Sequence, residues 1–357
     1  MPAESIVIVG AGIIGLDVAL VLAKAGLGKS TTVDDANSLN QSSDPDKDMA
    51  DSIRAGCNFS AISGSDANAL RWDRVGYSHL CKLASETEEK AFVERTPSIE
   101  MWDEEIPHEK IKHMSDYLED FKVLPQEELP EGVKFAVSFT TLTVNAPAYL
   151  LYLYRTLKDR YGVRFIRQKV PDIQSGFISL DTKVVFNCTG NAAKTLSGVE
   201  DQRCYPTRGQ VVLVRAPQVR TNVMRHGKNY ETYVIPRPGS NGNAILGGYM
   251  QKGSGDGATY YHETISIMDR THKLSSELRE KDSEVLAIVA GLRPSREGGA
   301  RVEGVEVDVG GRQGLIVHNY GAGGTGFQAG YGMALEAVEA AATALKDIQH
   351  AGLKSRL

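Results

Sequence analysis

The apolar and polar residues of this chain follow two different periodicities. Residues 5–9 form an apolar, β-branched run that predicts a strand buried on both faces, and the helical pattern that follows ends at Gly26. A strand over 314–318 and an alanine-rich helix over 331–348 repeat this order near the end of the chain. Residues 208–250 instead alternate apolar and polar positions, which is typical of a meandering sheet.

The remaining segments contain both patterns. Periodicity and turn residues predict helices over 66–95 and 147–161, strands over 163–166 and 183–190, a strand-like region over 100–145 and a polar loop over 37–54. Strand-and-helix segments therefore stand at both ends and in the middle of the chain. We predict an α/β fold with a discontinuous Rossmann-like domain, into which a second domain with a mixed, largely antiparallel sheet is inserted in two pieces.

Two glycine-rich stretches near the N-terminus compete as a nucleotide site. GAGIIG, residues 10–15, follows a strand and opens a helix. In that context Gly10 makes the tight turn, Gly12 admits a pyrophosphate to the backbone, and Gly15 lets helix and strand pack closely. An acidic residue about 20 positions later, Asp34 or Asp35, fits the adenosine ribose.

The second stretch, GLGKST at residues 26–31, does not fit a phosphate loop. Ala23 stands where the first glycine of a P-loop belongs, and the stretch follows a helix instead of a strand. We therefore interpret it as a helix cap at Gly26 or Gly28, followed by a strand over 31–33.

A third glycine-rich turn, NYGAGGTGF at residues 319–327, lies between the last strand and the last helix. One explanation is a flexible connector. The other is a second contact to a large cofactor, because a helix N-terminus presents N–H groups and a partial positive charge. A flavin ring, which gains negative charge near N1 and C2=O on reduction, would need such donors.

Composition and charge exclude several classes of protein. The net charge of −5 gives no general attraction for nucleic acid or for anionic membranes. No apolar run approaches the roughly 20 residues that span a bilayer, and a strand so near the start leaves no room for a secretory signal. The four cysteines and eight histidines lack the spacing of a metal site, so no metal is expected.

The candidate chemistry outside the glycine turns rests on one arginine. Arg293 stands in an apolar, proline-bounded stretch, where its planar guanidinium suits either a structural ion pair or a substrate carboxylate. Tyr233 and Tyr249 end strand-like stretches and either pack there or point the same way. No residue is a candidate catalytic acid or base, which favours a reaction whose chemistry a cofactor performs.

Five segments together resemble the D-amino-acid oxidase family, which includes D-aspartate oxidases. They are VIVGAGIIGL, AGCNFS, VVFNCTGNAAKTL with RGQVVLV, YVIPRPG with ILGGY, and GLRPSREGGARVE with HNYGAGGTGFQ. The segments cover most of the chain in the family's order, and the last two are specific to this family among flavoproteins. The resemblance points to a fungal-type peroxisomal member.

The resemblance implies a noncovalently held FAD that stretches from the GAGIIG turn to the C-terminal glycine loop. Arg293 then pairs with the substrate carboxylate and Tyr233 donates a hydrogen bond to it. The carbonyl of Gly324 accepts from the amino group, and Gln328 stands beside flavin and substrate. The expected substrate-binding residues are Arg293, Tyr233, Tyr249, Gly324, Gln328 and Arg225. The expected FAD-binding residues are Gly10, Ala11, Gly12, Ile13, Ile14, Gly15, Asp34, Asp35, Ala55, Gly56, Asn58, Val170, Thr189, Gly190, Arg293, Gly323, Gly324, Gly326, Phe327 and Gln328.

The resemblance also implies the domain division and the reaction. The FAD-binding domain is expected over 1–65, 147–200 and 288–357, and the substrate domain over 66–146 and 201–287. The implied reaction is oxidative deamination of a D-amino acid by hydride transfer from Cα to flavin N5. Its products are a 2-oxo acid and ammonia, and dioxygen reoxidises the flavin to give hydrogen peroxide. A D-aspartate or D-glutamate oxidase, a glycine or sarcosine oxidase and a noncatalytic flavoprotein are the alternatives.

The last three residues, Ser355-Arg356-Leu357, are a conservative variant of the Ser-Lys-Leu peroxisomal address. Peroxide production favours this interpretation, so the peroxisomal matrix is the expected location and the import receptor an expected partner. The resemblance leaves a homodimer open.

The preference for one substrate side chain over another is expected to depend on residues 222–230, which we predict to form a lid over the substrate. There Arg225 or His226 falls about where acidic-substrate members of the family keep a cation. Met250 and Phe59 suggest an apolar pocket, so we expect neutral D-amino acids to be preferred. Residues 29–54 depart most from the family's pattern.

Overall fold

The structure is a computed structural model that describes residues 5–34, 56–60, 66–86, 92–228 and 230–354. It divides the chain into two compact units, each made of separate pieces. Unit 1 comprises Met1–Met49, Leu150–Tyr205 and Pro294–Leu357, and unit 2 comprises Ala50–Tyr149 and Pro206–Arg293.

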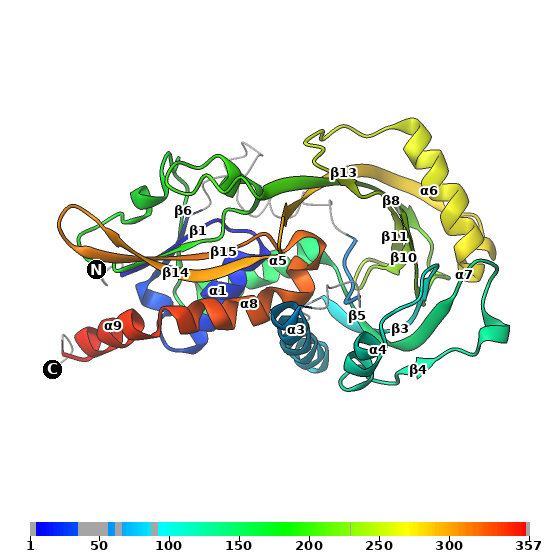
Figure 1. Cartoon of the computed structure of the whole chain (residues 1–357), viewed down its shortest axis with the longest axis horizontal. Coiled ribbons are helices and arrows are strands. Elements are labelled where there is room, and N and C mark those ends of the chain that lie inside the picture. The colour runs from blue at the N-terminus through cyan, green and yellow to red at the C-terminus, as the bar shows by residue number, and fades with distance from the viewer. Residues whose placement is uncertain (1–4, 35–55, 61–65, 87–91, 229, 355–357) are drawn as a thin grey trace. The chain divides into compact units, whose positions relative to one another are not determined.

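Unit 1 is built on one sheet whose central strands β1, β2 and β7 are fully buried. Its strand order is β14-β15-β7-β1-β2-β6, in which β15, β7, β1, β2 and β6 run parallel and β14 pairs antiparallel to β15 (Figure 1). The strands are β1 (Ile6–Val9), β2 (Thr31–Asp34), β6 (Arg164–Ile166), β7 (Val184–Asn187), β14 (Arg301–Asp308) and β15 (Gln313–Tyr320). The helices are α1 (Ile13–Lys24), α8 (Gly326–Ala340) and α9 (Ala342–Lys354), with single turns η1 (Gly28–Ser30), η4 (Ile173–Gly176), η5 (Gly190–Lys194) and η6 (Gly323–Thr325).

Unit 2 is built on a larger mixed sheet. Its order is β12-β8-β11-β10-β9-β3-β5-β4, with β13 paired to β8, and the described neighbours are antiparallel except for β3 and β9. Its strands are β3 (Val93–Trp102), β4 (Lys122–Val123), β5 (Phe135–Val144), β9 (Asn222–Gly227), β10 (Tyr230–Pro236), β11 (Asn243–Gly247) and β12 (Gln251–Lys252). Its helices are α3 (Ala67–Ser85), α4 (His108–Ser115), α6 (Tyr261–Leu274) and α7 (Ser276–Arg279), with a turn η2 (Gln126–Glu128). Three of the boundaries between the two units fall inside elements, namely β8 (Cys204–Arg215), β13 (Glu284–Arg296) and α5 (Ala146–Arg155). Helix α5 continues into η3 (Thr156–Arg160).

The two faces of the unit 2 sheet carry different side chains, because successive residues of a strand point to opposite sides. On one face Val234, Leu246 and Val212 pack against Ile267 of α6. On the other face Tyr233 packs with Met224 and Ile245. We call the second surface the Tyr233 face.

In unit 1, helices α1 and α8 cross at close range (Figure 1). A Cβ on Gly330 would lie 2.5 Å from the Oδ2 atom of Asp17, so only glycine allows this approach. Burial raises the pKa of Asp17 well above its ordinary value, against the opposing charge of Lys24. The Asp17 carboxyl is therefore favoured in its neutral form, which suits a buried helix crossing.

Much of the expected arrangement is confirmed. Helix α1 ends at Lys24, Gly26 follows its cap residue in the left-handed region at φ 83°, and residues 28–31 form a single turn and the start of β2. The expected 66–95 helix is wrong beyond Ser85, because β3 begins at Val93. The last helix begins at Gly326, five residues earlier than expected, and a new helix starts at Ala342. Helices α4 and α6 were not predicted.

The unit boundaries differ most from the expected domains over residues 50–65. We expected this segment in the FAD-binding domain, whereas its described part, residues 56–60, belongs to unit 2. Its described part lies along β5, where the Phe59 N–H donates to the Leu142 carbonyl and the Val144 N–H donates to the Cys57 carbonyl, both at 2.8 Å. Backbone hydrogen bonds therefore attach residues 56–60 to the second sheet.

Candidate active site

The three glycines of the first turn play three different structural roles. A Cβ on Gly10 would lie 2.4 Å from the Cys188 carbonyl oxygen, and a Cβ on Gly15 would lie 1.9 Å from the Gly10 carbonyl oxygen. A Cβ on Gly12 would meet no atom within 4 Å. Gly10 and Gly15 therefore close the strand-to-helix turn, while Gly12 faces open space at the start of α1, where a phosphate would fit.

The other expected cofactor residues of unit 1 gather at the same edge of its sheet. Because β1, β7 and β15 are parallel neighbours, the segments that follow them all leave from their carboxyl ends. A Cβ on Gly326, the first residue of α8, would lie 3.5 Å from the Cγ2 atom of Ile13, the first residue of α1. The N-termini of the two helices are therefore adjacent.

Among the described residues, no acidic side chain of the first turn and no side-chain cap meets either of these helix N-termini. Both α1 and α8 lack a side-chain cap hydrogen bond, and neither has an acidic residue in its first turn. The residues Ala11, Ile13 and Ile14 belong to the first N-terminus, and Gly323, Gly324 and Phe327 belong to the second. Two adjacent positive helix ends suit a ligand that carries or develops negative charge in two places.

A buried polar group links the ends of β7 and β15. The Asn187 side-chain oxygen accepts from the Thr189 hydroxyl at 2.7 Å, and its Nδ2 lies 3.0 Å from Nδ1 of His318. Burial, together with the charge of Arg301, lowers the pKa of His318 to about 4. His318 is therefore neutral and accepts at Nδ1, which holds the Thr189–Gly190 turn in place.

The remaining expected cofactor residues of unit 1 are placed less directly. Asp34 ends β2, and its Oδ1 accepts from the Gln168 N–H at 3.2 Å. Val170 packs against the cluster of Val7, Ile173 and their neighbours. Gln328 is buried in the first turns of α8. Their contacts with FAD stay predictions, and Asp35, Ala55 and the loop over 37–54 lie outside the described residues.

The carboxylate site expected in unit 2 is centred on Arg293. Its Nη1 donates to the Tyr249 carbonyl at 3.0 Å, and its Nη2 lies 3.5 Å from the Tyr233 hydroxyl. Within the part of the chain that the structure describes, this part-buried guanidinium contacts neutral groups and no carboxylate. A cation placed in this way is suited to pairing with the carboxylate of a ligand.

Tyr233 is positioned to donate to the same ligand. Its side chain is 5% exposed, and burial raises the pKa of its hydroxyl, against the opposing charge of Arg293. The phenol therefore keeps its proton at neutral pH and serves as a hydrogen-bond donor.

Three glycines make room for this pair, and the sequence analysis assigned them no role. A Cβ on Gly209 would lie 2.4 Å from Nη1 of Arg293. A Cβ on Gly247 or on Gly248 would lie within 2.5 Å of the Tyr233 ring or its hydroxyl. These glycines stand in the motifs RGQ and ILGGY, within segments predicted to be strands. A glycine inside a strand often marks a close approach of a large side chain, and this signal could have identified them.

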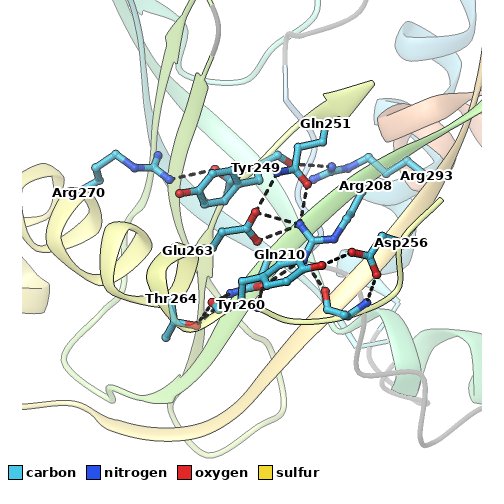
Figure 2. Close-up of polar contacts among 12 residues, drawn as sticks. Arg208, Gln210, Tyr249, Gln251, Asp256, Tyr260, Glu263, Thr264, Arg270 and Arg293 are labelled. Carbon is cyan, nitrogen blue, oxygen red and sulfur yellow. Dashed lines mark hydrogen bonds and ion pairs between the residues drawn. The ribbon is translucent and has the colours of Figure 1, made fainter. Parts of the chain in front are cut away.

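Tyr249 does not point the same way as Tyr233, which corrects one expectation. Its ring packs against the cluster on the α6 face, where the Arg270 guanidinium lies 5.4 Å from the ring centroid. Only the backbone carbonyl of Tyr249 reaches Arg293. Figure 2 shows the Tyr249 ring turned toward Arg270.

Arg225 is also placed differently from the expectation. Residues 222–227 are strand β9, and Arg225 pairs in register with Thr232, whereas Met224 pairs with Tyr233. By alternation, Arg225 lies on the face opposite Tyr233, where its Nε binds Asp103 Oδ1 at 2.8 Å. Arg225 is therefore an ion-paired residue and not a ligand for a substrate on the Tyr233 face.

His226 lies on the Tyr233 face but is already paired. Its Nε2 is 3.4 Å from Oε2 of Glu100, and its Nδ1 is 3.7 Å from Oε1 of Glu231. Burial alone would lower the pKa of His226, but the hydrogen bonds to these two acidic residues raise it to about 9. The positive charge of His226 is thus surrounded by two acidic side chains.

The residues expected to make an apolar pocket do not form one together. Phe59 is fully buried and its ring packs edge-on against Tyr77 at a centroid distance of 5.0 Å, while Met250 is 49% exposed. Nearby, Asn58 Nδ2 donates to Met224 Sδ at 3.1 Å, and a Cβ on Gly56 would lie 2.6 Å from Ile245. Gly56 and Asn58 therefore support the Tyr233 face.

Comparisons with known proteins identify the family to which this chain belongs. A family model described as "FAD dependent oxidoreductase" (DAO) matches residues 5–340. The chain is 42% identical to a D-amino-acid oxidase of Schizosaccharomyces pombe, over 96% of this chain and 97% of that protein. It is 30% identical to a D-aspartate oxidase of Cryptococcus neoformans var. grubii, over 93% and 95%. A glycine oxidase from Bacillus cereus has a similar fold, with a TM-score of 0.68, 20% identity and coverage of 93% and 95%.

Two further properties concern the described residues only. No helix among them has both the length and the apolar composition to cross a membrane. Likewise, no group of three or more of their histidine, cysteine or acidic side chains is arranged to hold a metal ion.

The different roles of Gly12 and Gly15 are separable by substitution. Gly12→Ala places a methyl group in the space where a phosphate would lie, so we expect the dissociation constant of FAD to rise by about tenfold or more. We expect the thermal unfolding midpoint of the apoprotein to stay unchanged. Gly15→Ala should instead lower the apoprotein midpoint, because its Cβ overlaps the Gly10 carbonyl. Flavin fluorescence titration and differential scanning fluorimetry measure the two quantities.

Equal loss of apoprotein stability in both variants would contradict these roles. So would unchanged FAD affinity in Gly12→Ala.

Proposed function

The chain belongs to the family of FAD-dependent oxidoreductases, and we propose that it oxidises D-amino acids, with a preference for those that carry neutral side chains. The observation that carries this proposal is the Arg293 guanidinium, which meets the Tyr233 hydroxyl and no acidic group among the described residues. A 2-amino acid offers the carboxylate that such a pair binds.

The residues of this chain bind and orient the substrate. Arg293 and Tyr233 fix the carboxylate, and the carbonyl of Gly324 is the predicted acceptor for the amino group. With two substituents fixed, only one enantiomer directs its Cα–H toward the cofactor, which accounts for a choice between D and L substrates. FAD, held at the N-termini of α1 and α8, would supply the hydride acceptor, and its reoxidation by dioxygen would give hydrogen peroxide.

Charge on the Tyr233 face supports the preference for neutral side chains. Arg225 lies on the opposite face and is paired with Asp103. His226 lies on the same face as Tyr233 but between Glu100 and Glu231. A second carboxylate, as in D-aspartate, would meet this cluster of two acids and one imidazolium instead of an unpaired cation, and desolvating it there is unfavourable.

Replacing Glu231 tests this explanation. Glu231→Gln removes one negative charge beside His226, so we expect the ratio of kcat/KM for D-methionine to that for D-aspartate to fall about threefold to tenfold. Asp103→Asn is the matched control, because it removes an acid from a cation on the opposite face and should leave the ratio unchanged. Peroxide release in a coupled assay measures both values.

A faster reaction of the unmodified enzyme with D-aspartate than with D-methionine would overturn the neutral preference. If Glu231→Gln and Asp103→Asn change the ratio of the two kcat/KM values equally, then substrate preference does not depend on the charges of the Tyr233 face.

We also propose that Ser355-Arg356-Leu357, which lies outside the described residues, directs the enzyme to the peroxisomal matrix. An oxidase that releases hydrogen peroxide fits a compartment that removes it. The import receptor is the partner proposed for these residues, and a homodimer remains a prediction.

A fluorescent protein fused before the first residue tests the address in cells with marked peroxisomes. We expect the full chain to coincide with the marker and a chain ending at Lys354 to spread through the cytosol. A variant ending in Ser-Lys-Leu is the positive control. Identical distributions of the full and shortened chains would contradict the proposal.

A further inference from the structure

The segment that follows β11 determines where the carboxylate-binding pair lies. Gly247 and Gly248 pack directly against the Tyr233 ring, and the Tyr249 carbonyl is the backbone acceptor for Arg293. A displacement of residues 248–249 would therefore move both groups that meet the substrate carboxylate. What holds this segment in place thus bears on substrate binding.

Arg270 of helix α6 binds this segment from the opposite face of the sheet. Its Nη2 donates to the Gly248 carbonyl at 3.1 Å, and its Nη1 donates to the Glu231 carbonyl at 2.7 Å. The guanidinium also lies over the Tyr249 ring. Figure 2 shows Tyr249 between Arg270 and Arg293. One side chain therefore ties β10 to the turn that orients Arg293.

The contacts of Arg270 differ from those of a structural ion pair. Its other partners are the hydroxyls of Thr232 at 2.5 Å and Ser266 at 3.3 Å, and no acidic side chain contacts it in the described part of the chain. Its charge acts on the Tyr233 hydroxyl in the same direction as that of Arg293, since both oppose the rise in the pKa of Tyr233. Among the described residues the positive charge of Arg270 is thus balanced by no acidic side chain, and it lies at the segment that orients Arg293.

A second anchor on α6 holds the far end of the same segment and offers a comparison. Gln251 donates to Glu263 Oε1 at 2.8 Å and accepts from Arg208 at 2.6 Å. Arg208 and Glu263 form a fully buried ion pair at 2.8 Å (Figure 2). The charge of Arg208 is therefore neutralised by Glu263, as is typical of a purely structural contact. The charge of Arg270 meets no acidic side chain among the described residues.

We propose that Arg270 is a positioning residue for substrate binding: it fixes the Gly248–Tyr249 backbone so that Arg293 and Tyr233 meet the substrate carboxylate, and its charge strengthens that site. The proposal rests on the proposed function, in which Arg293 binds the carboxylate. Arg270 itself touches no reacting atom in this account, so it acts through Arg293 and Tyr233.

Substitution of Arg270 in the FAD-loaded enzyme tests the proposal. Arg270→Met removes both the hydrogen bonds and the charge, so we expect KM for D-methionine to rise about tenfold while kcat changes less than about threefold. The dissociation constant of benzoate, a carboxylate without an amino group, should rise by the same factor when it is followed by the visible flavin spectrum. Arg270→Lys keeps the charge but cannot donate to the Glu231 and Gly248 carbonyls at the same time in the geometry of a guanidinium. We expect KM and the benzoate dissociation constant of this variant to lie between those of the unmodified enzyme and of Arg270→Met.

A matched control and a double variant separate positioning from general stability. Arg279→Met removes an arginine that donates to the backbone carbonyls of His272 and Lys273 near the end of α6, and should leave both constants unchanged. In an Arg293→Lys background, Arg270→Met should alter benzoate binding less than about twofold, because its target is already changed. If Arg270→Met does not fold, Arg270→Lys in the two backgrounds provides the same comparison.

The outcomes distinguish the proposal from its premise. Unchanged KM and benzoate affinity in Arg270→Met, or an equal change with and without Arg293→Lys, would overturn the positioning role. If Arg293→Lys itself leaves benzoate affinity unchanged, then the premise that Arg293 binds the carboxylate fails instead.

Discussion

The central constraint of unit 2 is that the part-buried guanidinium of Arg293 is held in place without an acidic partner among the described residues. An ion pair would fix Arg293 easily, but it would also fill the place that we propose for the substrate carboxylate. Neutral groups hold the Arg293 guanidinium instead. The Tyr249 carbonyl accepts a hydrogen bond from the guanidinium, and the Tyr233 hydroxyl lies beside it. Gly209, which has no side chain, allows the guanidinium to approach β8. An uncompensated buried charge generally costs several kcal/mol, and under the proposed function a bound carboxylate would offset part of that cost.

Unit 1 meets a related constraint with the backbone alone. The N-termini of α1 and α8 are adjacent and carry no acidic side chain in their first turns. The Asn187–His318 pair holds the neighbouring turn with a neutral imidazole, so it adds no charge to this edge. In both units the groups proposed to bind a ligand carry positive charge and meet no carboxylate among the described residues, and neutral hydrogen bonds hold their surroundings in place.

The part of the site that the sequence predicts well is the part whose constraint is local. Gly10 has a positive φ of 111°, and a Cβ on Gly15 would meet the Gly10 carbonyl, so two of the three glycines are required within one short turn and the motif identifies it, although a Cβ on Gly10 would also meet the distant Cys188 carbonyl. Arg225 and Tyr249 could not be placed, because their direction depends on strand register and on the exit from β11. Helix α6 has few apolar residues on its buried side, and the role of Arg270 arises only from contacts with residues 231–249.

Reduction of the flavin by a D-amino acid bound through Arg293 is the central step proposed for this protein. Mixing the FAD-loaded enzyme with D-methionine or L-methionine in the absence of dioxygen, and following the visible flavin absorbance, tests this claim most directly. The account predicts rapid bleaching by the D enantiomer, none by the L enantiomer, and a much weaker apparent affinity for D-methionine in Arg293→Lys. A flavin that stays oxidised with D-methionine, or that both enantiomers bleach at equal rates, would contradict it.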